Sequence, residues 1–447
     1  MSTPLIALNA ATLPTWLATA SDAQRRWIAA TGFAALAGSH CIVPDNDGGI
    51  ACVLAGVGKV DDVYALAHLP MQLPIGDYAL ADDGLKLDAW RAALGFGFGS
   101  YQFKRYRAPR RAPATLQVPS DVDGGVLDAV IKASTLTRDL VNTPSEDMGP
   151  VHLAELTASM ASAHGGNFRE WVGDELLTHN FPAIHAVGRA SHRAPRLLEL
   201  NWGDAAHPLI AIVGKGVCFD TGGLDIKPAD GMRNMKKDMG GAAHALALAE
   251  LIMRLRLPIR IQLLIPAVEN AISSNSYRPG EVIATRKGIS VEIDNTDAEG
   301  RVVLCDALAY ASEHAPAMIV DFATLTGAAR IALGADLPPV FSNDDALRDA
   351  AVAAGIRVQD PIWPMPLWQP YLGMLDSRIA DIANSGPSRY AGCITAALYL
   401  QRFVPDSLPW LHLDTYAWND ADRPGRPHGG EALGLRAIFE LLRTRYA

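Results

Sequence analysis

The chain alternates apolar runs with longer helical patterns through most of its length, and this alternation limits the possible folds more than any other feature. Residues 209–213, 259–265 and 318–322 are typical of buried strands, whereas 240–256 and 301–313 have the spacing of helices. Strands that are apolar on both sides need helices on both faces of their sheet. The sequence therefore predicts an α/β fold with a mixed, mainly parallel sheet covered by helices on both faces.

The length of 447 residues favours two or three domains. Near the N-terminus, two short apolar runs at 41–44 and 50–55 flank a Gly-containing turn and predict a strand pair. We also expect helices at 60–69 and at 85–94, the second ending at Gly95. We therefore divide the chain into a smaller N-terminal α/β domain (1–120), a linker helix (121–143) and a larger C-terminal α/β domain (144–447).

Composition and charge exclude several classes of protein. With 39 Lys+Arg against 48 Asp+Glu, the net charge of −9 gives no electrostatic reason to expect nucleic acid or an anionic membrane as a partner. The basic, Pro-broken run at 104–111 is better explained as an exposed linker than as a nucleic-acid patch. An apolar fraction of 49% is too high for an intrinsically disordered chain.

Several features favour the cytoplasm. The five cysteines are scattered and form no C-x-x-C pair, so neither a disulfide framework nor a zinc knuckle is expected. No apolar run approaches the length of a membrane span. The first residues lack the basic and apolar regions of a signal peptide.

Charged residues gather where predicted strands pass into helices. Asp297, Glu299 and Arg301 are spaced by two, so in an extended stretch they would point into one cavity. A solvated turn that caps the next helix explains the same residues about equally well, because acidic groups favour helix N-termini.

Two further segments also place charged residues at the junction of a predicted strand or helix. Lys215 directly follows the strand 209–213, and Asp220 and Lys227 come soon after it. Their order does not match the phosphate-binding loop G-x-x-x-x-G-K-[ST], so we exclude a nucleotide site there. Asp238 stands at the start of an Ala-rich helix, where the alternative interpretation is a helix cap.

Together these segments supply the four carboxylates Asp220, Asp238, Asp297 and Glu299. Clustered carboxylates raise one another's pKa unless cations neutralise them, and two divalent metals would do so. No H-E-x-x-H sequence is present, so a single-zinc site on a helix is not available.

Three segments in this order resemble the leucyl aminopeptidase family (the M17 cytosol aminopeptidases). They are Gly214-Lys-Gly-Val-Cys-Phe-Asp-Thr-Gly-Gly, Met235-Lys-Lys-Asp-Met-Gly-Gly-Ala-Ala and Asn295-Thr-Asp-Ala-Glu-Gly-Arg301. Residues 141–150 and 378–397 are similar to further family segments. The resemblance runs from about residue 56 to the C-terminus and is strongest between 141 and 400.

The resemblance implies a role for each matching residue. One tightly held metal would be bound by Lys215, Asp220, Asp238 and Glu299. A more exchangeable metal would be bound by Asp220, Glu299 and both the carboxylate and the carbonyl of Asp297. Lys227 would stabilise the oxyanion, and Arg301 would hold a bicarbonate that acts as general base. Met235, Thr324 and Gly327 would line the pocket for the first side chain of the substrate.

The implied activity is that of a metal-dependent aminopeptidase with two Zn²⁺ or Mn²⁺ ions per subunit. A hydroxide bridging the metals would attack the first peptide bond of peptides with a free N-terminus, with preference for Leu or another bulky apolar residue. The implied protein is a cytoplasmic homohexamer that needs neither a membrane nor nucleic acid.

The sequence departs from the family at several positions. Cys218 replaces Thr or Ser and is best explained as a structural thiol. Asp225 is expected to pair with Lys227, and Tyr416 and Trp418 to narrow the pocket. His412 and Asp414 suggest a catalytic triad, but without a G-x-S-x-G nucleophile a strand pair at the sheet edge is the better interpretation. Residues 419–430 are expected to form a loop.

Two other functions fit the residues less well. A different two-metal hydrolase, such as a phosphatase, would need a cluster of arginines, and only Arg301 lies in the motifs. A DNA-binding role, which some family members have, is disfavoured by the negative net charge.

Overall fold

The computed structural model describes residues 2–447 and divides them into two units. The smaller unit contains the chain up to Lys132 together with Ala421–His428, and the larger unit contains Ala133–Asp420 and Gly429–Ala447. The division falls inside α5 (Gly124–Asn142), the helix that the sequence predicts as a linker.

The smaller unit is built on a five-stranded sheet in the order β2-β3-β1-β4-β5. Alternate residues of its central strands point to opposite faces, and both sets are apolar. Leu5 and Val53 face a core with α4, whereas Ile6 and Leu54 face a core with α1 and α2. The elements are β1 (Thr3–Leu8), α1 (Leu13–Thr19), α2 (Asp22–Thr31), β2 (His40–Pro44), β3 (Ile50–Gly56), α3 (Leu69–Gln72), β4 (Asp77–Leu80), α4 (Ala89–Gly99) and β5 (Thr115–Leu116).

Two helices of this unit differ from the sequence prediction. Residues 60–68 form turns, and the carboxylate of Asp62 accepts a hydrogen bond from the Tyr64 N–H at 2.9 Å, which competes with a helix. Gly95 lies inside α4 and does not end it. A Cβ at this position would lie 1.8 Å from the Val63 carbonyl oxygen, so the glycine permits a close approach of two backbones.

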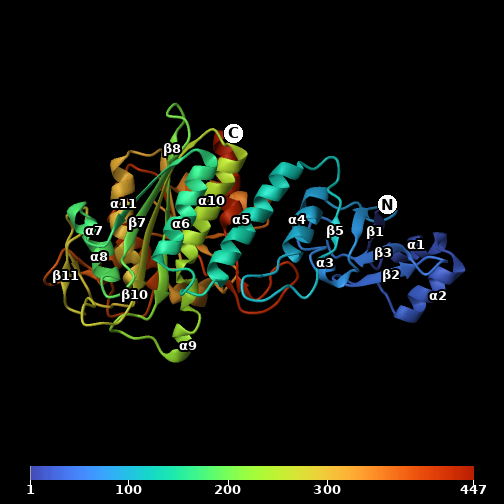
Figure 1. The fold of residues 1–447 in the computed structure, drawn as a ribbon, viewed down its shortest axis with the longest axis horizontal. Helices are drawn as coiled ribbons and strands as arrows, with labels where there is room; N and C mark the ends of the chain where they lie inside the picture. Colours follow the sequence, from blue (N-terminus) through green and yellow to red (C-terminus); the bar gives the residue numbers. More distant parts are fainter. Residues whose placement is uncertain (1) are drawn as a thin grey trace. The chain divides into compact units, whose positions relative to one another are not determined.

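The larger unit contains the predicted mixed, mainly parallel sheet, in the order β15-β14-β17-β13-β8-β10-β7-β6, with β9 paired to β10. Figure 1 labels its strands β7, β8 and β10. The predicted strands at 209–213, 259–265 and 318–322 are confirmed as parts of β8, β10 and β13. The strands are β6 (Asn167–Val172), β7 (Arg196–Trp202), β8 (Leu209–Gly214), β9 (Gly216–Asp220), β10 (Arg260–Asn270), β13 (Met318–Ala323), β14 (Pro339–Ser342), β15 (Trp363–Pro364) and β17 (Trp410–Asp414).

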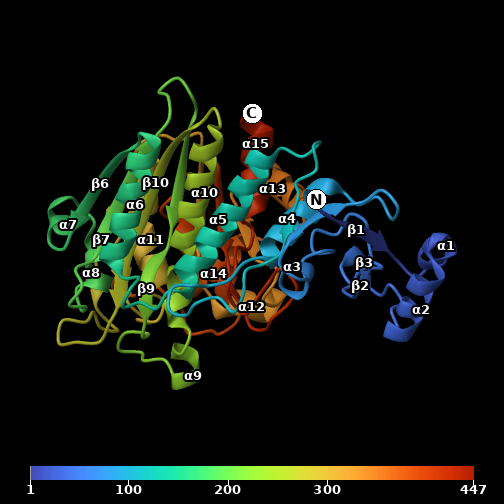
Figure 2. The ribbon, with the colours of Figure 1, turned by 45° about the vertical axis from the view of Figure 1, so that its right-hand side comes forward.

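Helices cover both faces of this sheet, as predicted. α6 and α10 lie side by side over one face in both ribbon views (Figure 2), and α8, α11 and α14 pack on the other. The helices are α6 (Pro150–His164), α7 (Glu175–Thr178), α8 (Pro182–Gly188), α9 (Ala229–Met232), the 3-10 helix η1 (Met235–Met239), α10 (Gly240–Leu255), α11 (Glu299–Glu313), α12 (Gly327–Leu333), α13 (Asp345–Arg357), the 3-10 helix η2 (Gln369–Leu375), α14 (Gly392–Gln401) and α15 (Leu435–Tyr446).

Short strands complete the larger unit. β11 (Val282–Ile283), β12 (Val291–Glu292) and β16 (Ile382–Ala383) form a small sheet, and β18 (Trp418–Asn419) pairs with β19 (Gly429–Gly430). The predicted loop at 419–430 is therefore flanked by a short antiparallel pair.

The four central strands β17, β13, β8 and β10 are parallel, so their C-terminal ends meet at one edge of the sheet. Open α/β sheets bind their ligands at this edge. Lys215, Thr324 and Asn270 stand at the ends of three of these strands, and Thr415 and Tyr416 follow the fourth.

His412 does not lie at a sheet edge, contrary to the sequence prediction. Its strand β17 runs between β13 and β14, and the imidazole is fully buried. His412 Nδ1 lies 2.6 Å from Asp321 Oδ1, and the Trp410 indole N–H donates to the other oxygen of the same carboxylate at 2.6 Å. The pair is part of the core.

All five cysteines are buried free thiols, and burial raises the pKa of Cys218 well above its usual range, which fits a structural role. Within residues 2–447 we find no helix with the length and apolar character needed to cross a bilayer.

Candidate metal centre

Three carboxylates from two separate parts of the chain meet at the C-terminal edge of the sheet. Asp220 ends β9, Asp297 precedes α11 and Glu299 is the first residue of α11. One oxygen from each lies within 4.8 Å of the others. Asp220 Oδ1 accepts hydrogen bonds from the Gly222 N–H and the Asn270 amide, both at 2.8 Å, and these bonds fix its orientation.

Two lysines lie among these carboxylates. The Lys215 ammonium forms ion pairs with Asp238 Oδ2 at 2.7 Å and Glu299 Oε1 at 2.8 Å, and it donates a hydrogen bond to the Thr324 carbonyl at 2.9 Å. Lys227 pairs with Asp220 Oδ2 at 2.8 Å and also with Asp297. We refer to Lys215, Asp220, Lys227, Asp238, Asp297 and Glu299 as the carboxylate–lysine cluster.

The cluster holds more negative than positive charge, because two ammonium groups face four carboxylates. Burial and then the neighbouring Asp220 raise the pKa of Glu299 well above its usual range and that of Asp297 to about 6. Burial alone would lower the pKa of Lys215, but Asp238, Glu299 and Asp220 raise it. Glu299 Oε2 is buried without a hydrogen-bond partner among the described residues. The donor set of carboxylate oxygens and one amine fits divalent cations.

The structure corrects the reasoning that placed Asp297 and Glu299 together. The segment is not extended: the Asp297 N–H donates to the Asn295 side chain at 2.7 Å in a tight turn, and Glu299 begins a helix. The two carboxylates converge through this turn. Arg301 lies one half-turn further along α11 and forms no ion pair with the cluster.

Arg301 is a buried residue of the first turn of α11. Its Nη1 donates to the Asn384 carbonyl at 3.0 Å, while its Nε has no hydrogen-bond partner within residues 2–447. Burial lowers the pKa of the guanidinium from its usual value. An N–H group of a buried cation is thus left available for an anion.

Asp238 lies in η1 and is not a helix cap. The Thr324 hydroxyl lies 2.8 Å from Asp238 Oδ1 and 2.9 Å from the Asp238 carbonyl, so it holds this carboxylate in place. Thr324, which was expected to line the pocket, therefore also contacts an expected metal ligand.

Asp225 does not pair with Lys227. Its Oδ2 accepts hydrogen bonds from the Thr296 N–H at 2.8 Å and from the Thr296 hydroxyl at 3.1 Å. Gly222 and Gly223 have φ values of +87° and +64°, and they turn the chain back onto Thr296. Lys227 is left free to face the cluster.

The two other expected pocket residues lie near the same edge. Met235 begins η1 and is half-buried, and Gly327 begins α12 with open space beside it, since an added Cβ would meet no atom within 4 Å. Tyr416 is half-buried, and the Trp418 side chain is buried. Trp418 therefore belongs to the core more than to a pocket wall.

Several residues around the cluster were missed from the sequence. Asn270 ends β10 and donates to both Asp220 and the Thr296 carbonyl, and Asn384 contacts the backbone of Asp294 and Asn295. A polar side chain at the end of an apolar strand was the available signal for Asn270. Asn384 lies in an irregular segment and gave no such signal.

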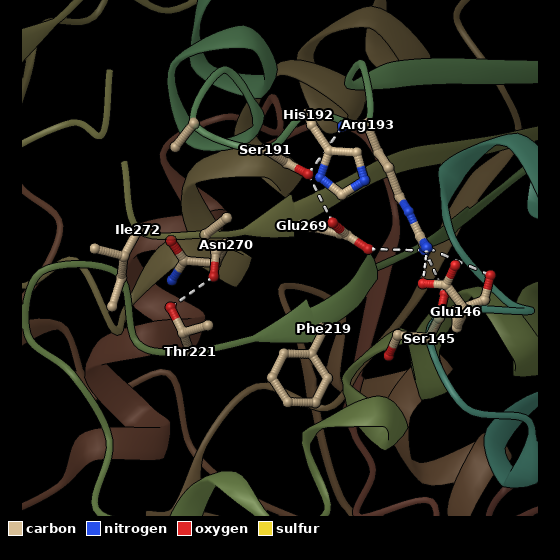
Figure 3. A pocket seen from close by; sticks show the side chains of 12 residues that line it. Ser145, Glu146, Ser191, His192, Arg193, Phe219, Thr221, Glu269, Asn270 and Ile272 are labelled. Carbon is tan, nitrogen blue, oxygen red and sulfur yellow. Dashed lines mark hydrogen bonds and ion pairs between the residues drawn. The ribbon is translucent and has the colours of Figure 1, made fainter. Parts of the chain in front are cut away.

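A cavity of about 470 Å³ lies beside the cluster (Figure 3). Its lining includes Thr221, which follows Asp220 in the chain, and Asn270, which donates a hydrogen bond to Asp220. Its charged groups are already paired: Glu269 accepts from the Ser191 hydroxyl at 2.6 Å and from Arg193 at 3.2 Å, and Arg193 also contacts Glu146. These groups form a closed network, so we place the chemistry in the cluster itself.

Comparisons with known proteins agree on one family. The family model described as cytosol aminopeptidase family, catalytic domain, matches residues 135–439, and the M17 aminopeptidase N-terminal domain matches residues 3–119. A probable cytosol aminopeptidase from Roseiflexus castenholzii is 41% identical over 363 residues, which are 77% of this chain and 74% of the relative. One from Syntrophotalea carbinolica is 40% identical over 366 residues, 78% of this chain and 73% of the relative.

Solved structures show the same similarity. The crystal structure of cytosol aminopeptidase from Coxiella burnetii is 49% identical, has a TM-score of 0.97 and covers 100% of this chain and 98% of its own. The bottromycin maturation enzyme BotP in complex with Mn is 32% identical, has a TM-score of 0.89 and covers 99% of each chain.

Proposed function

The chain belongs to the cytosol aminopeptidase family M17 and is an aminopeptidase-type hydrolase, and on this premise we propose that its carboxylate–lysine cluster binds two divalent metal ions. The observation that carries the proposal is the convergence of Asp220, Asp297 and Glu299 within 4.8 Å, with a buried Glu299 oxygen left without a partner. Carboxylates this close favour a cation between them.

In this proposal, Lys215, Asp220, Asp238 and Glu299 hold one ion, while Asp220, Asp297 and Glu299 hold the other with the help of the Asp297 carbonyl. Asp220 and Glu299 are shared. The contacts of Lys215 with both Asp238 and Glu299 support its place in the first set. Mn²⁺ and Zn²⁺ both suit this donor set, and the manganese complex of BotP supports Mn²⁺.

When bound, two divalent ions supply Lewis acidity and make a water molecule nucleophilic near neutral pH. The remaining work belongs to the chain. Lys215 has to lose its proton before its nitrogen can act as a ligand. Lys227 stays cationic, since Asp220, Glu299 and Asp297 raise its pKa against the lowering effect of burial, and it donates to the carbonyl oxygen of the scissile bond as negative charge develops.

Arg301 is proposed to bind bicarbonate, which would take up the proton of the attacking water. The free, buried Nε of the guanidinium supports this role, because an anion would complete its hydrogen bonding. Lys227 and Arg301 then act at different stages, one on the oxyanion and one on the proton.

The preferred first residue is proposed to be Leu or another bulky apolar residue, with Met235, Thr324 and Gly327 forming the first-residue pocket. Methionine adapts readily to apolar side chains of different shape. Family membership also supports a cytoplasmic homohexamer that acts on peptides with a free N-terminus.

The test is hydrolysis of Leu-p-nitroanilide by protein dialysed against EDTA, with and without added Mn²⁺ or Zn²⁺. We expect no activity after chelation, recovery with metal, and no cleavage of N-acetyl-Leu-p-nitroanilide. Cleavage of p-nitrophenyl phosphate in place of the anilide would favour the phosphatase alternative. Metal-independent activity of the dialysed protein would refute the proposal.

The structure adds no observation in favour of a nucleic-acid role. Arg111, in the basic run at 104–111, donates to the backbone carbonyls of Met71 and Ala112, so part of this run stabilises the smaller unit.

A further inference from the structure

Lys237 is a buried cation that the proposed mechanism does not use. It adjoins Asp238, and only 7% of the residue is exposed. Within residues 2–447, its ammonium forms no hydrogen bond and no ion pair. Its Nζ lies over the ring of Tyr416, 5.0 Å from the ring centroid.

A second cation, without an ion pair among the described residues, lies at the same ring as Lys237. The Arg330 guanidinium lies 4.6 Å from the centroid of the same Tyr416 ring. The acidic groups nearby are already engaged. Asp238 pairs with Lys215, Asp414 accepts three hydrogen bonds from Leu325 and Thr326, and Asp420 accepts one from the Tyr416 hydroxyl at 3.0 Å.

These two cations lie where the segments of the first-residue pocket meet. Lys237 follows Met235 by two residues within η1. A Cβ added to Gly240 would lie 2.6 Å from the Ala417 Cβ and 2.8 Å from the Thr324 Cγ2. The glycine thus lets the segment of Tyr416 and Ala417, the end of β13 and the start of α10 close upon one another.

A largely buried lysine whose ammonium forms no ion pair is unfavourable, because the side chain has lost most of its contact with water without gaining a charged partner. The tyrosine ring compensates only in part. A carboxylate brought in by a ligand would satisfy the ammonium and strengthen its own binding through a charge-assisted hydrogen bond.

We propose that Lys237, with Arg330 beside it, forms a cationic wall of the first-residue pocket, so that the enzyme accepts acidic N-terminal residues and discriminates against basic ones. This inference rests on the proposed aminopeptidase function. It does not conflict with cleavage after Leu, since a glutamate side chain reaches about as far and only adds a charge at its end.

The test compares Glu- with Gln-p-nitroanilide, which differ in charge but hardly in shape, on the Mn²⁺-loaded full chain. The readout is the ratio of the two kcat/KM values within each preparation, which does not depend on the fraction of protein that is folded. In Lys237→Met we expect this ratio to fall by about tenfold, the size typical of one charge-assisted hydrogen bond. Lys237→Arg keeps the charge and should stay within about threefold of the unaltered protein.

Lys236→Met is the matched control. Lys236 is the neighbouring lysine, but its ammonium donates to the Asn142 carbonyl at 2.5 Å, so its removal should leave the Glu/Gln ratio unchanged. Lys237→Glu provides the opposite test, and we expect the ratio of Lys- to Leu-p-nitroanilide to rise by about tenfold.

An unaltered Glu/Gln ratio in Lys237→Met, with Leu-p-nitroanilide still cleaved, would overturn the cationic wall and leave the aminopeptidase proposal standing. A second outcome would also overturn the proposal. If Lys237→Met no longer distinguished Leu-Gly from its C-terminal amide, while its Glu/Gln ratio of kcat/KM values stayed unaltered, the ammonium would bind the C-terminal carboxylate of the peptide. Absence of Leu-p-nitroanilide cleavage by the unaltered protein would overturn both proposals together.

Discussion

Replacing Thr324 by valine should weaken metal binding through Asp238 while keeping the shape of the pocket wall. The Thr324 hydroxyl lies 2.8 Å from Asp238 Oδ1, and the two residues are 6% and 3% exposed. Valine removes this hydroxyl but keeps the branched side chain. The contact of Lys215 with the Thr324 carbonyl involves the backbone and is retained.

The size of the effect follows from this one hydrogen bond. A buried hydrogen bond to a charged group contributes about 1.5–3 kcal/mol, which corresponds to an affinity change of about 10- to 100-fold. Loss of a group that orients a metal ligand typically has an effect in the same range, about 10- to 100-fold. We therefore expect the Kd of the metal held by Asp238 to rise by about this factor in Thr324→Val.

The assay is calorimetric titration of EDTA-treated protein with Mn²⁺, followed by activity measured against free Mn²⁺ concentration. Thr324→Ser is the matched control, because it keeps the hydroxyl and loses only a methyl group. The valine variant should regain most of its activity at saturating metal. Equal metal affinity in the valine variant, the serine variant and the unaltered protein would show that this reasoning is wrong.

Three other predictions concern the remaining polar contacts. Lys227→Met should lower kcat by about 100- to 1,000-fold with a smaller change in KM, as measured by steady-state kinetics, because an oxyanion donor acts mainly in the transition state. Arg138 and Glu431 form an ion pair at 2.9 Å with side chains only 2% and 4% exposed, so Arg138→Met should lower the free energy of unfolding in urea by about 3–5 kcal/mol. Burial alone would lower the pKa of His412, but Asp321 raises it above its usual 6.5, so the folded protein holds this proton more tightly. The stability that this pair contributes should therefore be fully present below pH 6.5 and be lost as the pH rises through the folded pKa, by at most about 1.4 kcal/mol per pH unit, and Asp321→Asn should remove this part of the pH dependence.

The sequence predicted the elements whose signals are local. The apolar run at 209–213 forms most of β8, and the linker helix predicted at 121–143 is observed as α5, because burial on both faces and helical periodicity are encoded in consecutive residues. Gly95 was misjudged, since its small size serves a contact with Val63, which lies far away in sequence. The position of His412 inside the sheet depends on strand order, which no single segment encodes.

At the candidate site, too, contacts between segments that are distant in sequence could not be predicted. Asp297 and Glu299 lie together as expected, but through the turn at Asn295 and not through an extended strand. The contact of Asp225 with Thr296 depends on the chain reversal at Gly222 and Gly223. The roles assigned to the cluster and pocket residues stay predictions, and they rest on motif resemblance together with this geometry.

The segment Ala421–His428 belongs to the smaller unit, although the whole range Ala133–Asp420 separates it from the rest of that unit. It packs closely there: a Cβ at Gly425 would lie 2.9 Å from the Ala67 Cβ and 3.0 Å from the Tyr64 ring. During translation, the N-terminal unit therefore lacks one of its parts until nearly the entire polypeptide has left the ribosome.

A fragment cut within α5 would carry the same defect permanently, with the surface around Tyr64 uncovered. Closing such a long loop slows assembly and leaves apolar surface exposed to aggregation in the meantime. We therefore expect the N-terminal unit to fold stably only as part of the complete polypeptide, and not as a separate domain.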